Sequence, residues 1–63
     1  MNEEVFKAIA NNLIDFGYPD VTPTMIEEIY IAKKKGKKKL PYFVIGMFAD
    51  SQLNEAIERG LLK

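Results

Sequence analysis

Apolar residues recur at helical spacing in the first part of the chain. They lie three or four residues apart, which places them on one helical face: Phe6, Ile9, Ala10, Leu13 and Phe16. Asn2 is a suitable N-cap, and the two glutamates that follow it favour the positive end of the helix dipole. Gly17 suits the turn after a helix, and Pro19 prevents the helix from resuming. The pattern predicts a helix over about residues 3–16.

A second helical pattern follows the sequence VTPT at residues 21–24. Thr22 is a suitable N-cap, and Pro23 fits the first helical position because it needs no backbone N–H donor there. The apolar positions that follow have helical spacing: Met25, Ile26, Ile29, Tyr30 and Ala32. Gly36 ends the pattern just after three lysines, whose charges complement the negative end of the dipole. The pattern predicts a helix over about residues 23–35.

Residues 41–60 allow one helix or two. Pro41 can open a helix, and helically spaced apolar residues follow it: Phe43, Val44, Met47, Phe48, Leu53, Ala56, Ile57 and Leu61. Asp50 or Ser51 could instead cap a separate fourth helix. The sequence YFVI at 42–45 also permits a short strand, but the chain offers it no evident pairing partner. We therefore expect an all-α fold, a small three- or four-helix bundle, with residues 1–63 forming a single domain.

Composition limits how such a fold can be stabilised. At 63 residues the chain can bury only about 60% of the surface that it exposes when unfolded. It has no cysteine and no histidine, which excludes a disulfide framework and nearly excludes structural zinc. The hydrophobic share of 48% favours a folded chain over a disordered one. Stability must come from the apolar core or from a second subunit, and we expect neither metal nor cofactor.

Side chains suited to catalysis are scarce. Histidine and cysteine are absent, and Ser51 is the only serine. The glutamate pairs at positions 3–4 and 27–28 lie near predicted helix starts, where they complement the dipole. No glycine-rich phosphate loop is present. We expect no catalytic residues and no small-molecule substrate, so the chain is predicted not to be an enzyme.

The net charge is zero, but the charges are unevenly distributed. Six acidic residues and one lysine give −5 over residues 1–28, whereas six lysines give +6 over residues 33–39. Such a run can bind an anionic partner, either a nucleic-acid backbone without sequence specificity or an acidic protein surface. Tyr42 could stack on an unpaired base. The predicted binding residues are Lys33, Lys34, Lys35, Lys37, Lys38, Lys39 and Tyr42.

The alternative function is that of a protein-interaction module, or a small accessory or inhibitor protein, that uses an apolar interface. The sequence FVIGMFA at 43–49 is apolar around nearly the whole helix, which is typical of a helix covered on every side. A second copy of the chain is the simplest cover, so a homodimer is favoured over a monomer. The first two helices could also be enough to cover this segment, with Gly46 allowing one of them to approach it closely. The predicted interface residues are Phe43, Met47 and Phe48, and the lysines would then serve only solubility.

Two segments resemble ubiquitin-associated domains. NNLIDFGYPD at 11–20 is similar to the end of the first helix and the first loop of that family, with Phe16, Gly17 and Tyr18 on its Met-Gly-Phe/Tyr motif. LNEAIERGLL at 53–62 is similar to the family's third helix. Phe16 replaces the methionine, and the segment between the second and third helices is longer here. The resemblance implies that this loop and the third helix form a small apolar patch for ubiquitin.

The longest apolar run, residues 42–49, is too short to span a membrane and is interrupted by glycine. The N-terminal sequence is acidic, unlike the basic start of a secretory signal. We therefore expect a cytoplasmic protein without a membrane partner.

Overall fold

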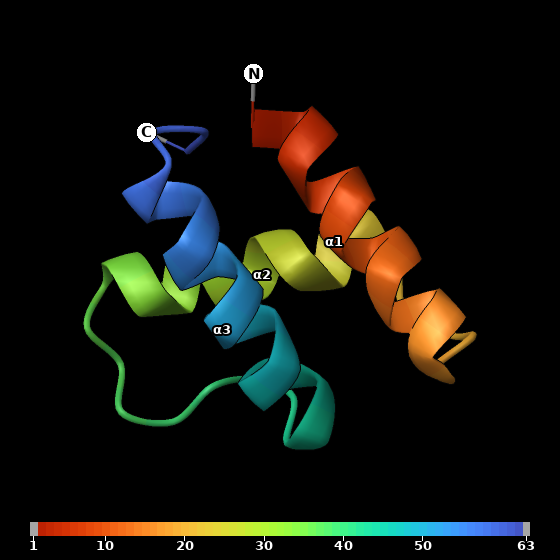
Figure 1. The fold of residues 1–63 in the computed structure, drawn as a ribbon. Helices are drawn as coiled ribbons and strands as arrows, with labels where there is room; N and C mark the ends of the chain where they lie inside the picture. The colour runs from red at the N-terminus through yellow and green to blue at the C-terminus, as the bar shows by residue number, and fades with distance from the viewer. Residues whose placement is uncertain (1, 63) are drawn as a thin grey trace.

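Three helices pack against one another in the computed structural model, which describes residues 2–62 (Figure 1). They are α1 (Asn2–Phe16), α2 (Pro23–Lys34) and α3 (Val44–Glu58). Each helix contacts the other two, and α2 crosses behind α1 and α3 in the view of Figure 1. The described residues contain no strand. The all-α prediction is therefore confirmed, and the residues from 2 to 62 form three helices.

The boundaries of α1 and α2 follow from local sequence chemistry. Thr22 has an extended backbone, and its Oγ1 accepts a hydrogen bond of 3.3 Å from the backbone N–H of Met25. Gly17 and Gly36 follow α1 and α2 with φ of +126° and +71°, a backbone region that other residues rarely adopt. Lys37 N–H then bonds to the carbonyl of Ala32, two residues before the end of α2, at 3.1 Å. These are the cap and stop positions that the sequence predicts.

The core lies where the three helices meet. Its largest fully buried side chains come from all three helices: Leu13, Ile26, Ile29 and Leu53. The rings of Phe6 and Tyr30 pack at a centroid distance of 5.5 Å at the edge of this core. The radius of gyration is 10.5 Å, close to the value of about 10.6 Å expected for a compact chain of this length.

Several apolar residues with helical spacing lie outside the core, among them Phe16, Ile57 and Leu61. The side chain of Phe16 is 68% exposed, because α1 ends at this residue and the chain turns away at Gly17. Leu61 is also exposed, whereas Leu62 is buried, since the turn after α3 brings the later leucine back to the core. Helical spacing identified the buried faces of α1 and α2, whereas α3 buries Gly46, Ala49, Leu53 and Ala56 and exposes the larger apolar residues of its first half.

Residues 44–58 form one continuous helix, so Asp50 and Ser51 do not cap a fourth. The helix begins three residues after Pro41, because Leu40 and Tyr42 on either side of the proline pack against the core. A Cβ atom added to Gly46 would lie 3.3 Å from Leu40 Cβ. The close approach that glycine allows is therefore made by Leu40 of the preceding connection, and not by α1 or α2 as predicted.

No helix within residues 2–62 has the length and hydrophobicity needed to cross a membrane. The same residues contain no group of three acidic side chains placed to hold a metal ion.

Candidate interaction surface

Three aromatic rings meet at the end of α1 and the first half of α3. Phe16 ends α1, Tyr18 lies in the turn that follows, and Phe48 belongs to α3. Phe48 contacts Phe16 edge to face at a centroid distance of 5.3 Å, and its ring lies 6.0 Å from that of Tyr18. The rings of Phe16 and Tyr18 are stacked at 6.2 Å. These distances are typical of stabilising aromatic pairs, yet much of the cluster faces solvent.

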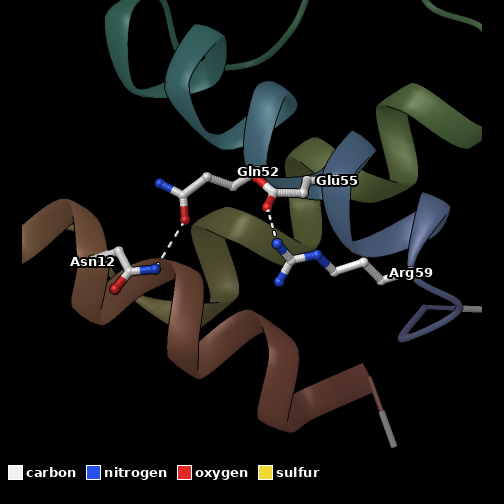
Figure 2. Close-up of polar contacts among 4 residues, drawn as sticks. All are labelled: Asn12, Gln52, Glu55 and Arg59. Carbon is white, nitrogen blue, oxygen red and sulfur yellow. Dashed lines mark hydrogen bonds and ion pairs between the residues drawn. The ribbon is translucent and has the colours of Figure 1, made fainter.

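Polar and backbone contacts fix the position of this cluster. Asn12 Nδ2 donates a hydrogen bond of 3.1 Å to Gln52 Oε1, across the line where α1 and α3 meet (Figure 2). Phe16 lies one turn after Asn12, and Phe48 one turn before Gln52, so the next pair along this antiparallel contact is the aromatic one. Tyr18 N–H bonds to the carbonyl of Leu13 at 3.0 Å and holds the turn against the end of α1.

The apolar surface continues to the first residue before α3. Phe43 is 84% exposed and Met47 is 64% exposed, and these residues are four positions apart. Val44 lies one turn before Phe48 and is also exposed. The name aromatic face is used below for Phe16, Tyr18, Phe43, Val44, Met47 and Phe48. The three residues predicted for an apolar interface all belong to it.

Phe43 has no evident role in the fold. It occupies the N-cap position of α3 but makes no side-chain cap hydrogen bond. Natural helices favour Ser, Thr, Asp or Asn there, because their side chains satisfy free backbone N–H groups. With most of its ring in solvent, Phe43 also contributes little to core burial. Neither the helix nor the core accounts for a phenylalanine at this position.

Two of the six predicted binding lysines interact with the protein itself. Lys33 Nζ lies 2.9 Å from Asp50 Oδ1, and both side chains are about two-thirds shielded from solvent. Lys34 Nζ lies 5.4 Å from the centroid of the Tyr30 ring, within the range of a cation–π contact. These lysines connect the end of α2 to α3 and to the core. Their predicted role toward an anionic partner stays a prediction.

The other four lysines lie in the connection between α2 and α3, which loops away from the helices in Figure 1. Lys35, Lys37, Lys38 and Lys39 are all exposed, and within residues 2–62 none of them forms an ion pair with a carboxylate. These four residues are called the lysine loop below. They form the part of the predicted cationic site that is most available to a partner.

Tyr42 anchors the end of this connection. Its hydroxyl donates a hydrogen bond of 2.9 Å to Glu28 Oε1, and its ring packs at the edge of the core. This hydrogen bond raises the pKa of Tyr42, and partial desolvation and the negative charge of Glu28 raise it further. Because the hydroxyl and one part of the ring are already engaged, a base would have to stack on the remaining surface. That stacking role stays a prediction.

Helical spacing predicts Phe16 for the core, and Tyr18 belongs to neither predicted binding surface. The signal that points to both residues is the resemblance to ubiquitin-associated domains, which implies a patch between the first loop and the third helix. Comparisons of the chain with models of protein families, with curated proteins and with solved structures give no match.

Proposed function

We propose that the chain is a three-helix bundle that acts without catalysis, as a protein-interaction module that binds its partner through the aromatic face. The observation that carries this proposal is Phe43, a phenylalanine at a helix N-cap with 84% of its surface exposed. A large apolar side chain in solvent is unfavourable unless a partner covers it, and position 43 offers the fold no compensating contact.

The rest of the aromatic face has the composition of an interface core. Aromatic residues and methionine are enriched at the centres of protein interfaces, and charged residues are depleted there. Phe16, Met47 and Phe48 fit the first part of that description. Rigid aromatic side chains also lose little conformational entropy when they are covered, which makes them effective contacts.

The lysine loop supports the same function from the border of the face. In Figure 1 the connection that carries it runs directly into the beginning of α3, where Phe43 lies. Charges at the border of an interface mainly steer association and select partners. We infer a partner with an apolar patch bordered by acidic side chains.

The test is site-specific photocrosslinking in the cells that produce the protein. A photoreactive phenylalanine analogue replaces Phe43 in one variant and Glu4 in a control variant. Glu4 is exposed in the first turn of α1, at the end of that helix opposite to Phe16. We expect a discrete covalent adduct from position 43 and none from position 4, with the partner identified by mass.

Equal crosslinking from both positions, or none from position 43, would contradict the proposal. A further variant with the analogue at Met47 tests the same face independently, because this side chain is also mostly exposed. An adduct with a second copy of the chain or with another protein, ubiquitin included, would support the function and identify the partner.

A second candidate function is electrostatic binding of nucleic acid, favoured by four exposed lysines without an ion pair among residues 2–62. Four phosphate contacts predict a logarithmic salt slope of about −3.6, or about a hundredfold loss of affinity between about 50 and 200 mM salt. Replacing Lys37, Lys38 and Lys39 with glutamine should remove most of that slope. Binding with no salt dependence, or no binding at low salt, would eliminate this candidate.

A further inference from the structure

We propose that the partner of the aromatic face is a second copy of this chain, related by a two-fold axis, with the lysine loop of each copy against Asp15 and Asp20 of the other. The proposal rests on the proposed function, because it identifies the partner of the same surface. Asp15 and Asp20 are called the acidic turn below. Two observations support this arrangement: the placement of the charges and their lack of ion-pair partners within residues 2–62 of one copy.

The charges lie on two sides of the aromatic face. Asp15 precedes Phe16, and Asp20 lies two residues after Tyr18, so both flank the part of the face that α1 and its turn contribute. The lysine loop precedes Phe43, at the part that α3 contributes. In Figure 1 the turn after α1 and the connection before α3 lie on opposite sides of the beginning of α3. The face therefore has an acidic side and a basic side.

The acidic turn is not neutralised within one copy. Asp15 and Asp20 are exposed, and the ion pairs formed among residues 2–62 join Lys33 to Asp50 and Arg59 to Glu55. Asp15 also lies in the last turn of α1, where the helix dipole disfavours a negative charge and no basic residue compensates it. As with Phe43, the local structure does not account for the residue at this position.

A two-fold axis through the aromatic face places the lysine loop of each copy against the acidic turn of the other. In such an interface each surface element contacts a different element of the other copy, and the reverse contact follows by symmetry. The basic side of one copy then meets the acidic side of the other twice, while the apolar centre meets itself. The same rotation covers Phe43, Met47 and Phe16, the most exposed apolar residues of the face.

The test measures solution mass by analytical ultracentrifugation for the natural chain and two charge-reversed variants. One variant carries Lys37→Glu, Lys38→Glu and Lys39→Glu, and the other carries Asp15→Lys and Asp20→Lys. All five side chains are exposed, so each variant should keep the fold, which circular dichroism verifies. Concentrations from about 1 μM to about 1 mM cover the range in which small interfaces dissociate.

We expect the natural chain to dimerise, and each variant alone to dimerise at least about tenfold more weakly, because like charges then face each other. An equal mixture of the two variants should restore a dimer containing one copy of each. A variant with Glu4→Lys and Glu58→Lys changes the net charge by the same amount as the acidic-turn variant, at exposed positions outside the face. Mixed with the lysine-loop variant, it should not restore the dimer.

Three results would overturn the proposal: a natural chain that stays monomeric throughout, charge-reversed variants that dimerise as well as the natural chain, or a mixture that fails to form the mixed dimer. The crosslinking experiment separates this failure from that of the proposed function. A monomeric chain that still forms an adduct with another protein from position 43 would retain the interaction module and exclude the second copy as its partner.

Discussion

The two connections between helices differ in what they contribute to the molecule. In the connection from α1 to α2, residues 17–22, Val21 is 3% exposed, Tyr18 packs on two phenylalanines, and Thr22 caps the next helix. In the connection from α2 to α3, residues 35–43, only Leu40 and Tyr42 pack against the core. The first connection therefore contributes a buried side chain to the core, whereas the second is attached by two partly buried residues and otherwise presents exposed lysines.

This difference separates residues that stabilise the fold from residues that remain for a partner. Tyr18 helps to position Phe16 and Phe48, so the first connection also builds one side of the aromatic face. The second connection leads to the other side of that face at Phe43. A change at Val21 or Tyr18 of the first connection should therefore reduce stability, while changes at the exposed lysines of the second should affect binding alone.

The largest expected difference in unfolding free energy is between substitutions of Val21 in the first connection and Leu40 in the second. Val21→Ala should lower the free energy of unfolding by about 2 kcal/mol, because it leaves a cavity in the core. Leu40→Ala should cost about 1 kcal/mol, since Leu40 is only partly buried. Urea unfolding followed by circular dichroism measures both. A larger loss for Leu40→Ala than for Val21→Ala would contradict the comparison.

A smaller effect distinguishes the two halves of the lysine run. Lys33→Gln should cost up to about 1 kcal/mol, because it removes the ion pair with Asp50. Lys38→Gln should change stability by less than about 0.5 kcal/mol, as expected for an exposed residue without such a pair. A double-mutant cycle with Asp50→Asn isolates the coupling. Equal costs for the two lysines would show that the ion pair contributes nothing specific.

The smallest effect concerns Tyr42, whose pKa is raised by its hydrogen bond to Glu28. A group with a higher pKa in the folded state stabilises the protein below its unfolded pKa, near 10, and that contribution is lost as pH rises through the folded pKa. The natural chain should therefore lose more stability than Tyr42→Phe between about pH 9 and pH 11. Other tyrosines and lysines cancel in the comparison. Parallel pH profiles of the two proteins would exclude the effect.

Local signals were sufficient to predict the first two helices. Thr22, Gly17 and Gly36 act through their own backbone or side-chain geometry, so their effects can be predicted from neighbouring residues alone. The start of α3 depends instead on distant contacts, because Tyr42 bonds to Glu28 and Leu40 packs on Gly46. Pro41 could have opened a helix, but these contacts draw the segment around it into a connection.

The candidate site was predicted only in part for a similar reason. Phe43, Met47 and Phe48 form an apolar run that can be seen in the sequence. Phe16 and Tyr18 join them only because α1 and α3 are antiparallel, and the helical spacing of Phe16 alone predicts a core position. The partners of Lys33 and Lys34 also lie outside the run of lysines, so composition alone overstates how many of the six charges are unpartnered.

The most direct test of the account is the thermal midpoint of the natural chain and of the double variant Phe43→Ser, Met47→Ser as protein concentration rises. Association through the aromatic face stabilises the folded state by mass action, so the midpoint of the natural chain should rise with concentration. The midpoint of the variant should stay constant and match that of the natural chain at high dilution, because both side chains are mostly exposed. A natural chain whose midpoint does not change with concentration, or a variant that follows the same rise, would contradict association of two copies through the aromatic face.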